Sequence, residues 1–175
     1  MDSQLINQIK DKIFATGAEL VPPASEDAIC LTETELGFRM PDLLRNCLMN
    51  VANGGFGPGY GFVGVANGYE SDFGSLFKTY KQIRGDQELV GCQWPSQLLP
   101  FCEWGNAIFS CVDCSSLEIW TFRDFELKRM NYSFSEFIER WLSGETSQLV
   151  ESGGRRRSVT IRNPFTGDDT IVSES

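Results

Sequence analysis

Histidine is absent from the 175 residues of the sequence, and its absence removes several classes of catalytic and metal site. Ser-His-Asp and Cys-His catalysis need an imidazole as the general base, and HExxH zinc sites need it as a ligand. Chemistry based on paired carboxylates, lysine or tyrosine stays possible. The absence therefore argues against an enzyme without excluding one.

Basic residues are also in short supply. The 15 Lys and Arg residues are outnumbered by 24 Asp and Glu residues, which gives a formal net charge of −9 and a pI of about 4.5. A general nucleic-acid binder needs a positive surface to displace phosphate counterions, so direct nucleic-acid binding is not expected. An acidic surface suits a basic protein partner, although solubility alone also explains it.

Long apolar runs are lacking as well. No stretch approaches the roughly 18 consecutive apolar residues that a membrane-spanning helix needs, and no basic segment leads from Met1 into an apolar run. We therefore expect neither a membrane span nor a signal peptide. The six cysteines are then expected to be thiols in the cytoplasm.

What the sequence does contain is enough apolar material for one folded domain. Hydrophobic residues make up 41% of the chain and aromatic residues 12%, which is more than a disordered chain carries. The length suits one domain with an appendage and is too short for two comfortable domains. We place a single domain at residues 1–144 and a tail at residues 145–175.

The tail differs from the domain in composition and charge. Residues 151–175 carry four arginines and four acidic residues, so the whole net charge of −9 belongs to the residues before them. The arginine run 155–157 is too short to indicate a phosphate site and is interpreted as solvated. Two β-forming runs, 159–162 and 170–172, predict either an edge hairpin or disorder.

The first half of the chain predicts helices. Apolar residues with helical spacing predict a helix over residues 4–16; they are Leu5, Ile6, Ile9, Ile13 and Phe14. Thr32 and Glu35 have capping-box spacing, which predicts a short helical turn that starts at Thr32 and ends at Gly37. A further helix is expected from Pro41 to the glycine-containing segment 53–55, because proline suits a first helical position and glycine a helix end.

The second half predicts strands followed by a final helix. The expected elements are a strand at 60–65, a loop at 66–75, a short helix at 76–84, a core segment at 94–101, and strands at 107–112 and 117–122 joined by a turn at 113–116. Ser133 and Glu136 form a capping box for the last helix, which Gly144 ends. This order predicts an α+β fold with a mostly antiparallel sheet, helices packed on one side, N-terminal helices and a C-terminal helix.

Two short segments match sequence motifs that are known from functional sites. Residues 59–64 read G-x-G-x-x-G, but a helix precedes them and a strand follows, which is the reverse of a dinucleotide site; we interpret them as a tight turn. Cys111 and Cys114 spell C-x-x-C at a hairpin turn, and zinc would need two more ligands such as Cys92 and Cys102, whose spacing fits no standard zinc pattern. Core or turn thiols are favoured, and a redox or metal role stays open.

Acidic residues gather through the middle and second half of the chain. Paired carboxylates support glycoside hydrolysis or metal-ion chemistry, but the spacing shows no convergence on one pocket. A solvated acidic face that meets a basic partner is the favoured interpretation. The candidate residues for this face are Glu70, Asp72, Glu103 and Asp113.

Several motifs then follow one another in a characteristic order. They are LGFRMPDLL at 36–44, NGGFGPG at 53–59, WP at 94–95, LLPF at 98–101, WGN at 104–106 and SFSEF at 133–137. Together they resemble the SUKH superfamily, which includes the fungal Smi/Knr cell-wall regulators. One departure is Ala107, which stands where members often have the last glycine of WGNG. The tail lies outside the resemblance.

The resemblance implies an α+β fold and a binding function in place of catalysis, with no cofactor and no metal. Bacterial members are mostly immunity proteins that bind and block toxins, often nucleases, whereas the fungal relatives act as scaffolds or regulators. We therefore expect a basic toxin domain as the partner, with an intracellular scaffold role as the alternative. A third hypothesis, an enzyme based on carboxylates or cysteine, would need a deep pocket.

The motif residues themselves are expected to be structural. Trp104 is expected to fill the core and Asn106 to cap a turn. The full set is Gly54, Gly55, Trp94, Pro95, Trp104, Gly105 and Asn106. Because the partners of the superfamily differ, the resemblance carries over no catalytic or binding residue.

Overall fold

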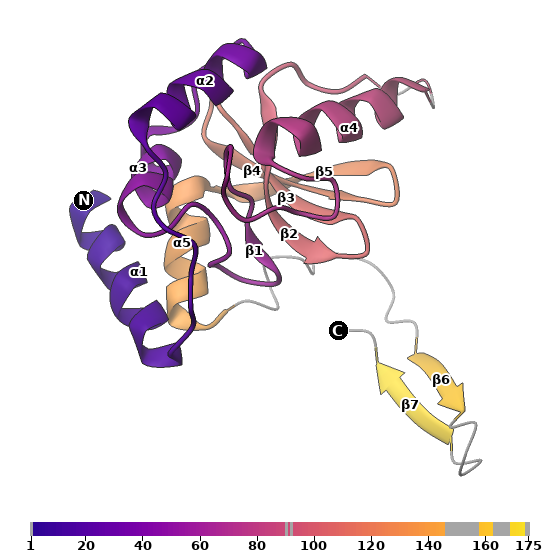
Figure 1. The fold of residues 1–175 in the computed structure, drawn as a ribbon. Helices are drawn as coiled ribbons and strands as arrows, with labels where there is room; N and C mark the ends of the chain where they lie inside the picture. The colour runs from indigo at the N-terminus through magenta and orange to yellow at the C-terminus, as the bar shows by residue number, and fades with distance from the viewer. Residues whose placement is uncertain (1, 90, 92, 146–157, 163–168, 174–175) are drawn as a thin grey trace.

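The computed structural model (Figure 1) describes residues 2–89, 91, 93–145, 158–162 and 169–173. Its helices are α1 Asp2–Thr16, α2 Glu26–Leu36, α3 Asp42–Asn50, α4 Leu76–Leu89 and α5 Phe134–Ser143. Its strands are β1 Gly61–Phe62, β2 Leu98–Gly105, β3 Ile108–Asp113, β4 Glu118–Arg123, β5 Glu126–Ser133, β6 Ser158–Arg162 and β7 Asp169–Ser173.

The main sheet has five strands in the order β1-β2-β3-β4-β5, and every neighbouring pair is antiparallel. Helix α4 packs against β2, and α5 packs against β4 and β5. Helix α1 lies against α3 and α5, as Figure 1 shows on its left-hand side. The predicted α+β class is therefore confirmed.

An aromatic cluster joins the sheet to the last helix. Phe101 of β2 makes edge-to-face contacts with Phe62, Phe134 and Phe137, at ring-centroid distances of 5.2, 5.0 and 5.1 Å. All four side chains are buried. Such aromatic pairs add to the free energy gained from burial alone, so this cluster fixes α5 on the sheet.

Helix α5 begins and ends where the sequence predicts. The Ser133 side chain accepts a hydrogen bond from the backbone of Glu136, and the Glu136 carboxylate accepts one from the backbone of Ser133. Gly144 ends the helix in the left-handed conformation. These hydrogen bonds to the carboxylate lower the pKa of Glu136. The predicted capping box is therefore confirmed.

The prediction of a helical turn that starts at Thr32 is wrong. Helix α2 starts at Glu26, with Ser25 as N-cap, because the Ser25 side chain accepts a hydrogen bond from the Ala28 backbone. Thr32 lies inside the helix and donates its hydroxyl to the Ala28 carbonyl. Gly37 ends the helix as predicted, with φ at 78°.

Other boundaries of the N-terminal helices also need correction. Helix α3 ends at Asn50, before the predicted segment 53–55, because Val51 acts as its C-cap. Phe14, expected on the apolar face of α1, is 90% exposed, whereas Leu5 and Ile9 are buried. The face of α1 that packs on the molecule is therefore narrower than its apolar sequence suggests.

The strands at the two edges of the main sheet differ from the prediction. Strand β1 has two residues and not six, because the Gly64 backbone donates to the Tyr69 carbonyl and turns the chain away. Strand β5 was not predicted, since its sequence ELKRMNYS lacks a clear apolar alternation. It forms because the turn at Asp124 and Phe125 folds it back on β4.

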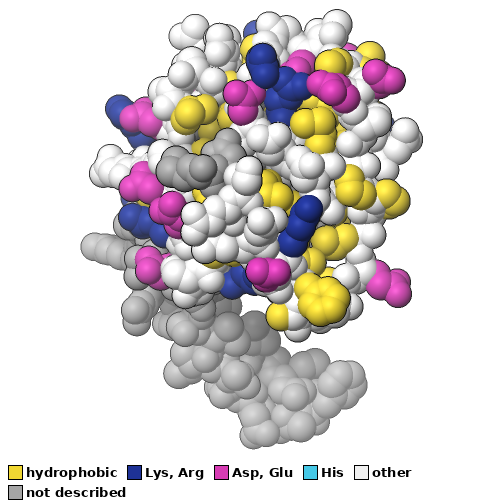
Figure 2. Space-filling view, turned by 90° about the vertical axis from the view of Figure 1, so that its left-hand side faces the viewer, with side chains coloured by type: hydrophobic (Ala, Val, Ile, Leu, Met, Phe, Trp, Pro, Cys, Tyr) yellow, Lys and Arg dark blue, Asp and Glu magenta, His cyan; other side chains and the backbone are white. Residues whose placement is uncertain are grey.

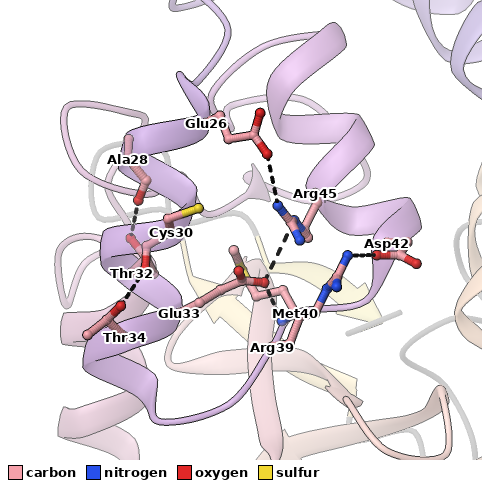
Figure 3. A network of polar contacts seen from close by, with 10 residues as sticks. All are labelled: Glu26, Ala28, Cys30, Thr32, Glu33, Thr34, Arg39, Met40, Asp42 and Arg45. Carbon is pink, nitrogen blue, oxygen red and sulfur yellow. Dashed lines mark hydrogen bonds and ion pairs between the residues drawn. The ribbon is translucent and has the colours of Figure 1, made fainter.

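A polar network connects α2 to α3, as Figure 3 shows. The Arg45 guanidinium lies 3.7 Å from the carboxylates of both Glu26 and Glu33. The Glu33 carboxylate also accepts a hydrogen bond of 2.8 Å from the Met40 backbone. One arginine of the domain therefore lies close to both acids and balances one of their two charges.

The described parts of the tail form a separate element. Strands β6 and β7 pair with each other as a two-stranded antiparallel sheet that does not extend the main sheet. The sequence predicted either a hairpin at the edge of the main sheet or a disordered tail. Strands β6 and β7 do form a hairpin, but it does not pair with an edge strand of the main sheet. The domain boundary after residue 144 stays a prediction. Within the described parts of the chain, no helix is long and apolar enough to cross a membrane.

Candidate protein-binding site

The four candidate acids do not lie on one face. In the register of β2 and β3, Glu103 pairs with Phe109, whereas Asp113 pairs with Leu98. Five residues of β2 separate the two positions, which is about 17 Å at the usual rise per residue. Glu103 and Asp113 therefore lie at opposite ends of the hairpin, here called the site end and the Asp113 end.

At the site end, Glu103 is a buried carboxylate and not part of an acidic surface. The residue is 1% exposed, and the Asp72 backbone donates to its carboxylate at 3.4 Å. Burial raises the pKa of Glu103, and the nearby Asp72 charge raises it further, against the effect of the backbone hydrogen bond. No Lys or Arg among the described residues forms an ion pair with it.

The loop 66–75 covers this carboxylate and carries the exposed acids. Phe73 stacks on Phe109 with a centroid distance of 5.8 Å, on the face of the sheet that Glu103 shares with its cross-strand partner. Both Glu70 and Asp72 are exposed, and Glu70 lies 4.0 Å from the Lys78 ammonium. The loop therefore presents two acids to solvent above a third that is buried.

The same loop is held firmly by hydrogen bonds. The hydroxyls of Ser71 and Thr79 are both buried and lie 2.7 Å apart. The backbone of Tyr69 donates to the Asn53 carbonyl at 2.8 Å. Positions of the exposed acids are thus set by the fold, which lowers the entropy lost when a partner binds.

Aromatic side chains lie beside these acids. Tyr60 is 58% exposed, and its ring lies so close to Gly105 that an added Cβ there would approach it to 3.1 Å. Trp104, expected in the core, is only partly buried and donates from its indole to the Ser110 hydroxyl at 2.9 Å. Partial burial and the charges of Glu103 and Asp72 raise the pKa of Tyr69. The residues Tyr60, Tyr69, Glu70, Asp72 and Glu103 are called the β1 edge site below; Trp104 is not part of it, because Ser110, which its indole reaches, neighbours Phe109 in β3 and so lies on the other face of the sheet.

Backbone packing of the glycine-rich segment supports this site. An added Cβ at Gly54 would lie 2.6 Å from the Gly64 nitrogen and 2.7 Å from the Phe62 carbonyl. The Asn53 side chain accepts from the Val65 backbone and donates to the Ala66 carbonyl. Only glycine allows backbones to approach this closely, and the chain after β1 enters a loop and not a helix, unlike a dinucleotide site.

The turn between β2 and β3 completes the site end. Gly105 pairs with Ile108, so Asn106 and Ala107 form a two-residue turn. Their φ angles are 51° and 57°, which is the type I′ geometry that suits the twist of a hairpin. Asn106 tolerates this conformation, whereas alanine does so at a cost.

Asp113 has a different role from Glu103. Its carboxylate accepts hydrogen bonds from the Ser115 backbone at 2.8 Å, the Ser115 hydroxyl at 2.6 Å and the Ser116 backbone at 3.2 Å. Partial burial raises the pKa of Asp113, but these hydrogen bonds outweigh it and the net pKa is lowered. The Asp113 carboxylate therefore holds the turn between β3 and β4.

The cysteines of the C-x-x-C motif lie in or beside the core. Cys111 is buried in β3, and burial raises its pKa well above the usual thiol value. Burial, and secondarily the Asp113 charge, raises the pKa of Cys114 to about 12. Such thiols are poor nucleophiles and poor metal ligands at neutral pH. Cys102 is buried, and Cys92 lies outside the described residues.

Trp94 and Pro95 lie before β2 and outside the β1 edge site. The Trp94 indole donates to the Leu98 carbonyl at 2.9 Å, and its ring packs edge-to-face on Phe122. The Pro95 carbonyl accepts from the Leu98 backbone. Both residues therefore shape the entry of the chain into the sheet. Gly55 packs against the Tyr69 ring in a similar supporting position.

The face that carries the N-terminal helices offers no field of one sign. Figure 2 views the molecule from the left-hand side of Figure 1, where α1 and α3 lie, and shows basic and acidic side chains interspersed. Mixed charges of this kind favour solubility more than recognition. The β1 edge site, in which aromatic and acidic residues adjoin, is the stronger candidate.

Sequence reasoning found the acids of this site but missed its tyrosines. Glu70, Asp72 and Glu103 do come together, whereas Asp113 does not. Each tyrosine directly follows a glycine, Gly59 or Gly68, and Tyr69 directly precedes Glu70. A tyrosine in a glycine-rich loop beside an acid was the sequence feature that could have indicated the site. In the described part of the chain, no group of three His, Cys, Asp or Glu side chains is placed to hold a metal ion.

Comparison with known protein families identifies a family for most of the domain. The model of the SMI1 / KNR4 family (SUKH-1) matches residues 23–140. The matched region extends from just before α2 into α5, so it contains the whole main sheet and leaves out α1, β6 and β7. No curated protein matches the chain.

Proposed function

Because the chain belongs to the SMI1/KNR4 family (SUKH-1), we propose that it is a non-enzymatic protein-binding module that neutralises a toxin, as immunity proteins do. The single observation that carries the proposal is the β1 edge site. There, exposed acids and aromatic rings adjoin a buried carboxylate that no described basic residue neutralises. This combination favours a positively charged protein surface as the occupant.

The aromatic residues supply contact area. Tyrosine and tryptophan are enriched among the residues that dominate binding energy at protein interfaces, because they bury a large rigid surface at a small entropic cost. Tyr60 is exposed and Tyr69 partly so.

The acids supply long-range attraction. Glu70 and Asp72 lie on a loop fixed by buried hydrogen bonds, above the desolvated carboxylate of Glu103. A basic partner is attracted by this field before contact, which raises the association rate. Nuclease toxins fit this description, because a nuclease must hold phosphate at a positive surface, and we propose a nuclease domain in the cytoplasm as the target.

Two features support a function without catalysis. Asp72 and Glu103 meet through the Asp72 backbone N–H, while Asp113 lies at the other end of the hairpin. Burial raises the pKa of Cys111 and of Cys102, so neither thiol is activated as a nucleophile.

A second candidate function is that of an intracellular scaffold or regulator of the Smi/Knr type. It is favoured by the tail, because β6 and β7 form their own sheet and lie outside the family match. In that case the tail would be the recognition element and the partner would be a cellular protein.

The experiment that separates the two is a capture assay from cells that encode the protein. The tagged chain, a Glu70→Lys/Asp72→Lys variant and a tail-truncated variant are used as baits at low and moderate salt. A matched control, Asp11→Lys/Glu19→Lys, makes the same change of charge at exposed positions of the N-terminal region.

We expect the unmodified chain, the matched control and the tail-truncated chain to retain a basic, toxin-like domain that salt releases. The Glu70→Lys/Asp72→Lys variant should lose it. Capture of a cellular protein that depends on the tail and is indifferent to Glu70 and Asp72 would contradict the immunity proposal and support the scaffold role.

A further inference from the structure

Two asparagines of the chain are followed by glycine, and both stand in the same short sequence, Val-Ala-Asn-Gly. They are Asn53 before Gly54 and Asn67 before Gly68. The side-chain carbonyl of an asparagine can be attacked by the backbone nitrogen of the next residue, and glycine hinders this attack least because it has no side chain. The local sequence therefore makes the two asparagines equally reactive, and the fold decides which of them reacts.

The Asn53 side chain is held in the core. Asn53 is 4% exposed, its amide nitrogen donates to the Ala66 carbonyl at 3.1 Å, and its amide oxygen accepts from the Val65 backbone at 2.9 Å. The side-chain carbon of Asn53 cannot approach the Gly54 nitrogen until both hydrogen bonds break inside the domain. Asn53 is therefore expected to react only when a large part of the domain unfolds.

The Asn67 side chain is exposed in a turn that runs from Val65 to Gly68. No residue in the described part of the chain is hydrogen-bonded to this side chain. The Gly68 N–H closes the turn by donating to the Val65 carbonyl at 2.9 Å. Opening of one surface turn frees the Gly68 nitrogen, and such local openings are far more frequent than unfolding of a core.

The fold itself favours this pair of residues in the turn. Residue 67 has a φ of 61°, a conformation that asparagine adopts more readily than most residues. At Gly68, an added Cβ would lie 2.4 Å from the Asn53 side-chain carbon and 2.5 Å from the Asn53 backbone oxygen, so only glycine fits there. The packing that protects Asn53 thus requires a glycine directly after Asn67.

We propose that Asn67 is a site of spontaneous deamidation that alters the β1 edge site. The Gly68 nitrogen bonds to the side-chain carbonyl carbon of Asn67, the bond from that carbon to the side-chain nitrogen breaks, and ammonia leaves with the proton that the Gly68 nitrogen has lost. Water then opens the resulting cyclic imide at one of its two carbonyls. One opening gives aspartate, and the other gives isoaspartate, in which the main chain runs through the former side-chain carbon.

Both products change the loop 66–75. Aspartate adds a negative charge to the loop that carries Glu70 and Asp72. Isoaspartate adds a methylene group to the main chain just before Tyr69, whose backbone donates to the Asn53 carbonyl at 2.8 Å. The longer main chain is expected to displace this hydrogen bond and the exposed acids beyond it. A loss of toxin capture by the isoaspartate form rests on the proposed function; the reaction at Asn67 does not.

The test incubates the folded full chain at mildly alkaline pH and follows its peptides by mass spectrometry, because deamidation raises the mass by about one dalton. An isoaspartate-specific methyltransferase distinguishes the two products. The same chain incubated in urea reports the reactivity of both asparagines without the fold. Asn67→Gly is the matched control, since glycine also adopts a φ of 61° and has no amide to lose.

In the folded chain, we expect conversion at Asn67 to be at least about tenfold faster than at Asn53, because only Asn67 reacts through a local opening. Urea should bring the two rates close together. The amide signals of residues 68–72 should shift in the isotope-labelled isoaspartate form and stay unchanged when Asn67→Gly is incubated. Equal rates at the two asparagines in the folded chain, no conversion at Asn67, or unshifted signals in the isoaspartate form would overturn the proposal.

Failure of the two proposals is distinguishable. If only the toxin-binding proposal fails, Asn67 still deamidates ahead of Asn53, because the reaction needs no partner. If only the deamidation proposal fails, capture of the toxin still depends on Glu70 and Asp72. If both hold, the incubated chain captures less of the basic domain than Asn67→Gly incubated in the same way.

Discussion

Glu103 and Asp113 occupy the two ends of the β2–β3 hairpin, and their surroundings shift their pKa values in opposite directions. Burial beneath the loop 66–75 raises the pKa of Glu103, with one long backbone hydrogen bond against it. Hydrogen bonds from Ser115 and Ser116 lower the pKa of Asp113 despite its partial burial. One acid is held by its own turn, and the other has no cation from the described part of the domain.

This difference separates a structural acid from one that is available to a partner. A carboxylate with three local donors stabilises the turn that supplies them and gains little from further contacts. A carboxylate that the fold has already desolvated interacts strongly with a cation that a partner brings, because part of the desolvation cost is met before binding.

The largest effect is expected at Gly54, which supports the site end. Gly54→Ala places a Cβ within 2.7 Å of two backbone atoms and forces alanine to a φ of 84°. Overpacking and backbone strain together should lower the free energy of unfolding by at least about 3 kcal/mol. Gly37→Ala is the control, since its φ is 78° but its Cβ meets no atom within 4 Å, and it should lose about 1 kcal/mol. Equal losses in urea unfolding would show that crowding at Gly54 is unimportant.

At the Asp113 end, Asp113→Ala should lower the free energy of unfolding by about 1 kcal/mol, because the exposed turn donors of Ser115 and Ser116 lose their acceptor. Asp113→Asn keeps an acceptor oxygen and should lose less. Since the folded pKa is lowered, the stabilisation is present above the unfolded pKa and is lost as the pH falls through the folded pKa. Chemical denaturation of both variants from neutral to acidic pH checks this, and a difference from the unmodified chain that persists in acid would count against it.

At the site end, Glu103→Gln should stabilise the protein, in contrast to Asp113→Ala, and should raise the melting temperature at neutral pH. The pKa of Glu103 is higher in the folded than in the unfolded chain. The stability that depends on Glu103 is therefore fully present below the unfolded pKa and is lost as the pH rises through the folded pKa. The neutral amide avoids this loss and still accepts from the Asp72 backbone. Glu70→Gln, at an exposed position, is the control. A lower melting temperature of Glu103→Gln at neutral pH would mean that a cation within the domain already pairs with Glu103.

The smallest effect is expected in the turn at the site end. Ala107→Gly should raise the free energy of unfolding by up to about 1 kcal/mol, because Ala107 has a φ of 57° and glycine adopts this conformation freely. Ala15→Gly in α1 should lower it by a similar amount, as expected for an exposed helical position. Destabilisation by Ala107→Gly would mean that the methyl group makes a contact that outweighs the strain.

Features that depend on neighbours in sequence could be predicted from the sequence. The capping box of α5 needs only Ser133 and Glu136 three residues apart, and the hairpin of β3 and β4 needs two β-forming runs around a polar turn. The same logic failed at Thr32, because Ser25 supplies an earlier N-cap and the helix continues past the later pattern.

Features that depend on distant residues could not be predicted in this way. Strand β5 has a charged sequence and becomes a strand through its pairing with β4. The burial of Glu103 depends on the contact of Phe73 with Phe109, which brings the loop 66–75 over the sheet. The sequence therefore identified the acidic residues of the site, but it could not show which of them are exposed and which are buried.

Binding at the β1 edge site is tested most directly by the association rate of the purified chain with the basic domain that it captures, measured as a function of ionic strength. We expect the rate to fall as salt rises, and we expect Glu70→Lys/Asp72→Lys to lower the low-salt rate by about tenfold or more and to flatten the salt dependence. The Asp11→Lys/Glu19→Lys control should behave like the unmodified chain. Equal rates and equal salt slopes for both double variants would contradict the assignment of the β1 edge site as the binding surface.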